Sequence, residues 1–176
     1  PNPALATGGA VPADPSPDVS LTNRGSAQCM VARDEWFGRL PVRKALMTSP
    51  ATCTKESALH MAGRPDLVEA GVAERGEPPL LVCEKLAPAD RSTVAGELYL
   101  QKGPAPLSLL LDAEGGETAF GLYAEAACSE LTETLRATSL DGGVAREKDT
   151  YVTVFGHSGF LHAVAYAVAT AAGILP

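Results

Sequence analysis

The residues best suited to chemistry stand in one short segment, Tyr151 to Phe160, with the sequence YVTVFGHSGF. Its β-branched and aromatic first half predicts a buried strand, and the apolar residues from Ser158 to about Ala172 predict a helix. His157 therefore falls in a glycine-flanked turn between strand and helix, where an imidazole can serve catalysis or help to bind an anion. A purely structural histidine at a turn is an equal alternative.

The same turn also imitates the nucleophile elbow GxSxG of α/β-hydrolases, with Ser158 as the nucleophile. Two observations oppose this interpretation. Phe160 replaces the final glycine, and only 18 residues follow the serine, whereas the acid and the histidine of that family come later in the chain. His162 lies one turn along the same predicted helix and cannot approach Ser158 from across a site.

The remaining histidines and the cysteines indicate no metal site and no cofactor. His60 and His162 lack a metal-binding partner at i+4, and His162 is interpreted as a core or interface residue. The four cysteines form no CxxC pair and no zinc-ligand cluster; they are Cys29, Cys53, Cys83 and Cys128. We interpret them as reduced, mostly buried thiols, which favours the cytoplasm or an organellar stroma or matrix.

Composition favours a single compact domain over residues 1–176. The chain has 176 residues, 45% of them hydrophobic, and a formal net charge of −7. Its 14 Lys and Arg are scattered, so no basic face is expected to bind nucleic acid. The apolar run from Phe160 to Pro176 is interrupted by His162 and fits a core helix better than a membrane span. No secretory signal is recognised, although PNPALATGG is compatible with a trimmed mature end.

Periodicity predicts alternating strands and helices. Residues 1–20 are interpreted as a strand end followed by a proline-rich loop, residues 87–106 as mostly irregular, and a short helical stretch is placed between Pro65 and Glu74. The other predicted elements are a helix over Leu21–Leu40 with Thr22 as N-cap, a strand over Val42–Met47, a helix over Thr52–Ala62, and a strand over Pro79–Cys83. A long amphipathic helix follows Gly115-Gly116, with one face formed by Phe120, Ala124, Ala127, Leu131 and Leu135.

This alternation indicates an α/β fold with a mostly parallel sheet covered on both faces, in which function gathers where the strands end. The last helix is apolar nearly all round, so we expect it to be covered on most sides. Its polar residues fall at i, i+4 and i+8, at His162, Tyr166 and Thr170.

Four segments, in this order, resemble the histidine phosphatase superfamily, whose fold is the phosphoglycerate-mutase-like fold. Residues 21–28, LTNRGSAQ, are similar to its LTxxGxxQA helix start, and residues 48–58 are similar to its SPxxRxxxTA segment. Glu84-Lys85-Leu86 resembles the E-x-L after its third strand, and residues 154–160, VFGHSGF, resemble its VxxHGGF turn. The resemblance covers about residues 4–172 and implies a three-layer α/β/α sandwich with a mostly parallel central sheet.

The same resemblance implies a degenerate site. In the family, an RHG motif at the end of the first strand supplies the nucleophilic histidine and an arginine, and SPxxR supplies a second arginine. In this chain Gly8 takes the place of the nucleophile, Thr7 of its arginine and Cys53 of the second arginine, so only His157 is kept. Glycine cannot form a phosphoenzyme, and neither threonine nor cysteine supplies a cationic fork.

The implied phosphate pocket comprises Thr7, Gly8, Gly9, Cys53, His157 and Ser158. Backbone amides at Gly8-Gly9 and after His157 could still bind a weak anion. Glu84 and Glu97 are candidates for the acid that some family members use to protonate the leaving group. We expect a non-catalytic domain that acts as a structural or interaction subunit, with other protein chains as partners, because the predicted sheet is incomplete at both termini.

The alternative is an active phosphomonoesterase or phosphomutase that uses His157 with non-standard partners. Its RHG motif would then lie upstream of Pro1, or other residues would supply the chemistry. Arg24, Arg33 and Arg43 are the cations to test in that case.

Overall fold

The computed structural model describes residues 19–35, 43–69, 79–140 and 151–175. The chain divides into two compact units, each formed by two stretches of sequence. The first unit comprises Pro1–Val82 and Val144–Phe155, and the second comprises Cys83–Gly143 and Gly156–Pro176. The single domain expected from the composition stays a prediction.

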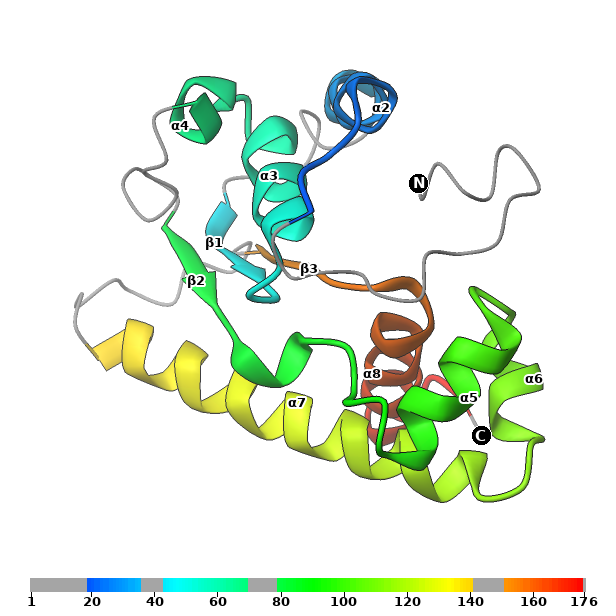
Figure 1. Ribbon diagram of the computed structural model, residues 1–176. Coiled ribbons are helices and arrows are strands. Elements are labelled where there is room, and N and C mark those ends of the chain that lie inside the picture. The colour runs from blue at the N-terminus through cyan, green and yellow to red at the C-terminus, as the bar shows by residue number, and fades with distance from the viewer. Residues whose placement is uncertain (1–18, 36–42, 70–78, 141–150, 176) are drawn as a thin grey trace. The chain divides into compact units, whose positions relative to one another are not determined.

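The first unit contains a parallel sheet of three strands in the order β2-β1-β3. The central strand is β1 (Arg43–Thr48), with β2 (Leu80–Val82) on one side and β3 (Tyr151–Phe155) on the other (Figure 1). The sequence therefore predicted all three strands to within two residues at each end. Ala45, Leu46 and Met47 are all fully buried, as expected for the central strand of a parallel sheet.

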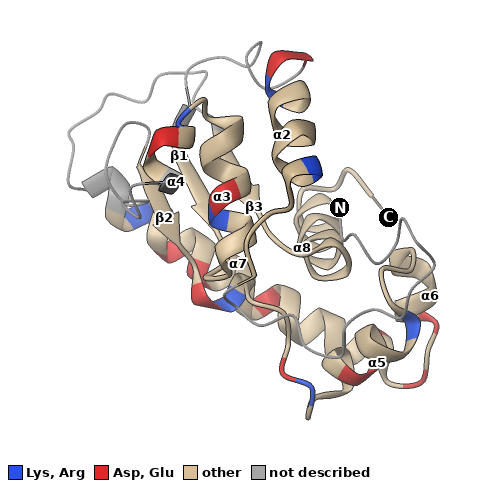
Figure 2. Ribbon diagram, turned by 45° about the horizontal axis from the view of Figure 1, so that its top comes forward, with Lys and Arg blue, Asp and Glu red and all other residues tan. Residues whose placement is uncertain are grey.

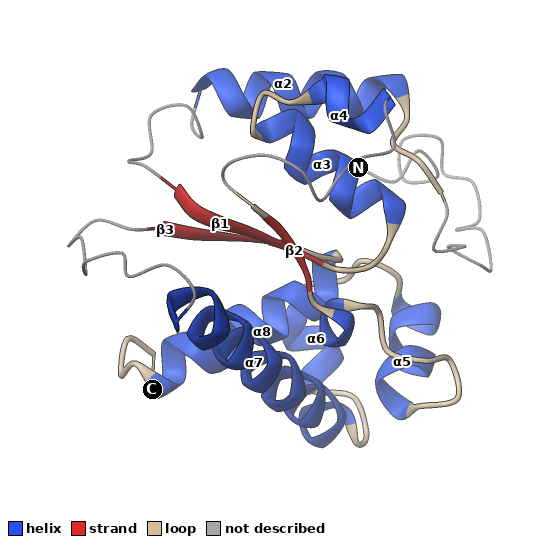
Figure 3. Ribbon diagram, turned by 90° about the vertical axis from the view of Figure 1, so that its left-hand side faces the viewer, coloured by secondary structure: helices blue, strands red, loops and turns tan. Residues whose placement is uncertain are grey.

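Three helices accompany this sheet: α2 (Asn23–Glu35), α3 (Thr52–Met61) and α4 (Pro65–Glu69). Figure 3 shows them on the same side of the strands. The apolar face of α3 packs on the sheet through a cluster formed by Leu46, Ala58, Leu59 and Leu80. Because these side chains leave water together, α3 and its first turn have a defined position at the end of β1.

Helix α2 begins where the sequence predicts. The Thr22 hydroxyl accepts a hydrogen bond from the amide of Gly25 (3.1 Å), which confirms Thr22 as the N-cap. The amide of Leu21 donates to the Glu56 carboxylate, which ties this helix start to α3. The predicted end of the helix, residues 36–40, lies outside the described residues.

The second unit is helical. It contains the short 3-10 helix η2 (Glu84–Leu86) and the helices α5 (Val94–Lys102), α6 (Leu107–Leu111), α7 (Gly116–Leu140) and α8 (Ser158–Ala171). Helix α7 is the long amphipathic helix of the sequence: Phe120, Ala124, Ala127 and Leu131 are buried, and α8 and α5 pack against it (Figure 1).

An aromatic cluster around Phe160 forms the centre of this unit. The ring centroid of Phe160 lies 4.9 Å from that of Tyr99, 4.9 Å from that of Tyr123 and 5.6 Å from that of Phe120. Gly159 packs so closely on Tyr99 that a Cβ there would lie 3.1 Å from the ring. The start of α8, which directly follows His157, is therefore held by dense aromatic packing.

The prediction of a mostly irregular stretch over residues 87–106 missed α5, which occupies nine of them. Its signals are local: the Thr93 hydroxyl accepts from the amide of Gly96 (3.2 Å), and Gly103 ends the helix with φ of +65°. A capping threonine and a glycine with positive φ are typical helix boundaries. The proline-rich flanks concealed a helix too short to show clear periodicity.

His162 is exposed, which excludes the core position, whereas the alternative of an interface residue stays a prediction. Tyr166, which shares its face of α8, is 45% exposed. Of the cysteines, which are all free thiols, Cys83 is buried and the other three are half-buried. In the described residues no helix is long and apolar enough to cross a membrane.

Candidate functional site

The parallel order brings three strand ends to one edge of the sheet. Thr48 at the end of β1 is paired with Val82 of β2 and with Phe155 of β3. The chain leaves each of these strands toward a segment that the sequence singled out, and these segments contain Cys53, Glu84 and His157. Cys53 belongs to the first unit, whereas Glu84 and His157 belong to the second.

A pair of buried hydroxyl groups holds the turn between β1 and α3. The hydroxyl oxygens of Ser49 and Thr54 are 2.7 Å apart and hydrogen-bonded, and the Thr54 hydroxyl lies 2.7 Å from its acceptor, the carbonyl oxygen of Ala51. The amide of Ser49 donates to the carbonyl oxygen of Phe155 (3.1 Å). Satisfied buried polar groups of this kind specify one arrangement of the turn.

Cys53 stands in the first turn of α3, next to this pair. Its side chain is half-buried. Burial raises the pKa of the Cys53 thiol above its ordinary value; hydrogen bonds with the backbone oppose this increase, and the Glu56 carboxylate adds to it. The thiol is therefore protonated and uncharged at neutral pH, and it supplies neither a cation nor a reactive thiolate.

Glu84 is the first residue of η2, and its backbone amide is hydrogen-bonded to a glutamate of α7. One carboxylate oxygen of Glu130 accepts from the amide of Glu84 (3.1 Å), and the other accepts from the amide of Lys85 (2.6 Å). The Glu84 side chain itself is exposed. Burial also raises the pKa of the neighbouring Cys83 thiol, an effect that a hydrogen bond with Thr134 opposes.

His157 is the N-cap residue of α8, with extended backbone (φ −89°, ψ 142°). Its carbonyl oxygen accepts from the amide of Leu161 (2.8 Å), but its side chain does not cap the helix. Burial lowers the pKa of the His157 imidazole below its ordinary value. The imidazole is therefore neutral at neutral pH, because the charged form loses more hydration when it is removed from water.

The other candidate residues fall into two groups. Ser158, in the first turn of α8, and Glu97, in the first turn of α5, are both exposed. Thr7, Gly8 and Gly9 lie outside the described residues. Within the second unit, the structure places Glu84 and Glu97 on different helices, η2 and α5. The pocket implied by the resemblance, which joins residues of both units, stays a prediction.

Of the three alternative cations, Arg33 is half-buried and is paired with the exposed carboxylate of its neighbour Asp34 (2.8 Å). Arg43 is the first residue of β1, and its side chain is not among those that the structure describes. Arg24 is exposed near the start of α2.

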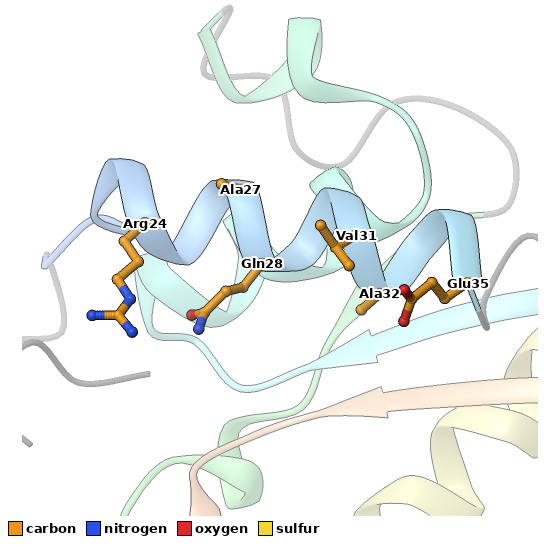
Figure 4. Close-up of a pocket in the computed structure, with 6 residues that line it drawn as sticks. All are labelled: Arg24, Ala27, Gln28, Val31, Ala32 and Glu35. Atoms are coloured by element: carbon orange, nitrogen blue, oxygen red, sulfur yellow. The ribbon is translucent and has the colours of Figure 1, made fainter. Parts of the chain in front are cut away.

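A shallow hollow of about 320 Å³ runs along α2, and Arg24 is one of its lining residues (Figure 4). The sequence did not predict this hollow. Its lining residues all come from this one helix and are Arg24, Ala27, Gln28, Val31, Ala32 and Glu35. Arg24 lies near one end and Glu35 at the other, with Gln28 and apolar side chains between them. Such a surface has no net charge and indicates no particular ligand.

The described residues contain no cluster of three or more His, Cys, Asp or Glu side chains that could hold a metal ion. Comparison of the chain with protein-family models, with curated proteins and with solved structures finds no match in any of the three.

Proposed function

We propose that the chain is a non-catalytic domain of the histidine phosphatase type, which acts as a structural or interaction subunit of a larger assembly and binds phosphate or another anion only weakly. The proposal includes the three-layer α/β/α sandwich that the resemblance implies. The parallel strands β2-β1-β3 support it, because each leads into a segment that resembles one of the family's motifs.

The observation that carries the proposal is the partial burial of Cys53 and His157, the two members of the implied catalytic set that the structure describes. Burial leaves Cys53 as a neutral thiol and His157 as a neutral imidazole at neutral pH. A phosphomonoester carries nearly two negative charges at that pH. Neither side chain therefore offers the positive charge that the ligand requires.

The expected loss of affinity is large. A hydrogen bond to a charged group contributes about 1.5–3 kcal/mol, and the bidentate arginine fork is the strongest form of this interaction with phosphate. Replacing one such arginine by a neutral thiol weakens binding by at least about tenfold, because 1.4 kcal/mol corresponds to a factor of ten. Thr7 and Gly8, at the other two positions, would add to this loss.

Exposed apolar side chains support the interaction role. Large hydrophobic residues that are more than 40% exposed occur in both units, and in the second unit they include Leu109, Leu122, Tyr166, Val168 and Ile174. Single exposed apolar residues are normal on a protein surface, but groups of them on one element are typical of sites that another molecule covers.

The direct test is incubation of the purified chain with p-nitrophenyl phosphate, followed by a search for acid-labile phosphohistidine. We expect no turnover and no labelled histidine. Turnover that His157→Ala abolishes, and that His162→Ala on the exposed side of the same helix leaves unchanged, would instead establish the alternative, an active phosphomonoesterase that depends on His157.

A further inference from the structure

Helix α2 packs on α3 with very little burial of its own. Of its 13 residues only Gly25 is buried, and its two large hydrophobic side chains, Met30 and Val31, are 43% and 55% exposed. The cluster that packs α3 on the sheet contains no residue of α2. Figures 1 and 3 show α2 on the outer side of α3, farther from the strands. The hydrophobic effect, which holds α3, therefore contributes little to the position of α2.

The face of α2 toward α3 is a stripe of mostly small side chains. The residues of α2 that are buried or half-buried are Gly25, Ser26, Cys29, Ala32 and Arg33, and the others are exposed. Spacings of three and four residues place this set on one face of the helix, and among the described elements α3 is the one that packs closely on α2. Small side chains let the two helices approach each other, but they remove little apolar surface from water.

Two polar contacts join α2 to α3, one near each end of α2. Directly before the helix, the backbone amide of Leu21 donates to the carboxylate of Glu56 in α3. In the last turn, the side chain of Arg33 lies over Gly63, just after the C-cap of α3. A Cβ at Gly63 would be 3.7 Å from Nη1 and 3.8 Å from Cδ of Arg33. Figure 2 shows that the charged residues of α2 stand near its two ends.

Both contacts are electrostatic. The Glu56 carboxylate accepts a charge-assisted hydrogen bond. The Arg33 guanidinium stands at the C-terminal end of α3, where a helix carries a partial negative charge, and its Nε is paired with the Asp34 carboxylate (2.8 Å). Gly63 has φ of +75° and no side chain, so it leaves room for the stem of Arg33. The attachment of α2 therefore depends on a few polar groups near its ends.

We propose that α2 is a strap, which detaches from α3 and closes again while α3 and the sheet stay folded. Regions with few buried apolar contacts open at a lower free energy than a core does. A free helix of 13 residues is marginal in water, so α2 unfolds when it detaches. Cys29, half-buried on the face toward α3, then becomes accessible, so the strap controls access to this thiol. This device goes beyond the proposed structural role and does not depend on it.

The test is hydrogen–deuterium exchange of the whole chain under native conditions, followed by mass spectrometry of its peptides. After correction for intrinsic rates, we expect the amides of α2 to exchange at least about a hundredfold faster than those of β1 and α3. We also expect both halves of α2 to exchange at the same rate, because the helix detaches as one unit.

Glu56→Ala is the decisive variant. It removes the acceptor of the Leu21 amide, and α3 should stay folded because alanine is the best helix former. We expect the exchange of α2 and the reaction of Cys29 with N-ethylmaleimide to become about tenfold faster, with β1 unchanged. Glu125→Ala is the matched control, because Glu125 is an exposed glutamate inside α7 and the change in net charge is identical.

Arg33→Gln tests the other end of the strap. Glutamine keeps a straight side chain that suits a helix, but it removes the positive charge at the end of α3. We expect α2 to exchange about two- to fivefold faster, because a charge at a helix terminus contributes less than a charge-assisted hydrogen bond. Arg136→Gln, at an exposed arginine of α7, is the control.

Three outcomes would overturn the proposal of a strap. The first is exchange of α2 as slow as that of β1, which would show that α2 opens only when the sheet unfolds. The second is equal acceleration of α2 in Glu56→Ala and Glu125→Ala. The third is acceleration of β1 together with α2 in Glu56→Ala, which would show global destabilisation. None of these results bears on phosphatase activity, so the proposed lack of catalysis is tested separately.

Discussion

Cys53 and His157 are uncharged for the same physical reason, although their pKa values are shifted in opposite directions. Partial removal from water disfavours the thiolate of Cys53 and the imidazolium of His157. No neighbouring charge reverses this effect for either residue in the described part of the chain. At the residue scale, the chemistry of the two positions is therefore that of neutral, polarisable side chains.

Cys53→Arg should restore part of a phosphate site if the resemblance places Cys53 correctly. A guanidinium at the first turn of α3 would contribute a charge-assisted hydrogen bond of about 1.5–3 kcal/mol, which corresponds to an increase in phosphate affinity of about 10–100-fold. Calorimetric titration with inorganic phosphate measures it. Cys29→Arg changes the net charge equally at another half-buried cysteine; an equal gain there would show that only net charge matters.

The lowered pKa of His157 predicts a specific dependence of stability on pH. The unfolded chain takes up the proton near the ordinary pKa of about 6.5, whereas the folded chain does so only at lower pH. The contribution of His157 is therefore complete above about pH 6.5 and is lost as the pH falls toward its folded pKa.

Urea unfolding at a series of pH values tests this dependence. His157→Asn should make the free energy of unfolding less sensitive to acid over the interval below about pH 6.5. His162→Asn removes an imidazole from the exposed side of α8 and is the control. A slope that is the same in all three proteins would show that His157 is not held neutral by the fold.

At the element scale, short segments are held by contacts that span long stretches of sequence. Glu130 of α7 accepts from the amides of Glu84 and Lys85, 46 and 45 residues earlier in the chain. In this way a long, regular helix positions a single turn of 3-10 helix.

Glu130→Gln tests this contact. The variant retains one acceptor oxygen and removes the charge, so it should lower the free energy of unfolding by roughly 1 kcal/mol. Urea denaturation measures the change, and Glu133→Gln, at an exposed glutamate of the same helix, is the control.

Two helical glycines should respond oppositely to alanine. A Cβ at Gly96 in α5 would collide with the carbonyl oxygen of Asp90, whereas a Cβ at Gly121 in α7 meets nothing within 4 Å. Gly96→Ala should therefore destabilise the chain by about 1–3 kcal/mol through overpacking. Gly121→Ala should stabilise it by up to about 1 kcal/mol, because alanine is the better helix former. Thermal unfolding of both variants measures the difference, and equal effects would contradict the close packing of α5.

For the whole molecule, the main question is whether the two compact units unfold together. The sequence predicts one domain, and the chain passes between the units more than once, which couples them covalently. If they form one cooperative domain, all probes should show the same transition. Trp36, the one tryptophan of the chain, falls in the sequence range of the first unit, and most of the helix content belongs to the second.

Phe160→Ala tests this cooperativity. Loss of the central ring of the aromatic cluster should cost about 3–5 kcal/mol. In a single domain, tryptophan fluorescence and far-ultraviolet circular dichroism should shift to lower urea concentration together. A shift of the dichroism signal alone would show that the second unit unfolds by itself and would refute the single domain.

The sequence by itself determined the elements whose signals are local and repeated. The apolar strands around Leu46 and Val154, the long face of α7 and the cap at Thr22 follow from residue type and spacing, because periodicity and capping depend on neighbours along the chain. The turn at His157 belongs to this group, since a β-branched strand and an apolar helix define it from both sides.

Only the tertiary structure decided properties that depend on neighbours distant in sequence. Three such properties depend on which groups surround a side chain. They are the ionisation of Cys53 and His157, the hydrogen bonding of Glu130 to η2, and the exposure of Tyr166 on α8. Desolvation and burial are properties of packed surroundings, and no local pattern encodes them. For that reason the sequence identified the candidate residues of the site, whereas their charge state became known only from the folded chain.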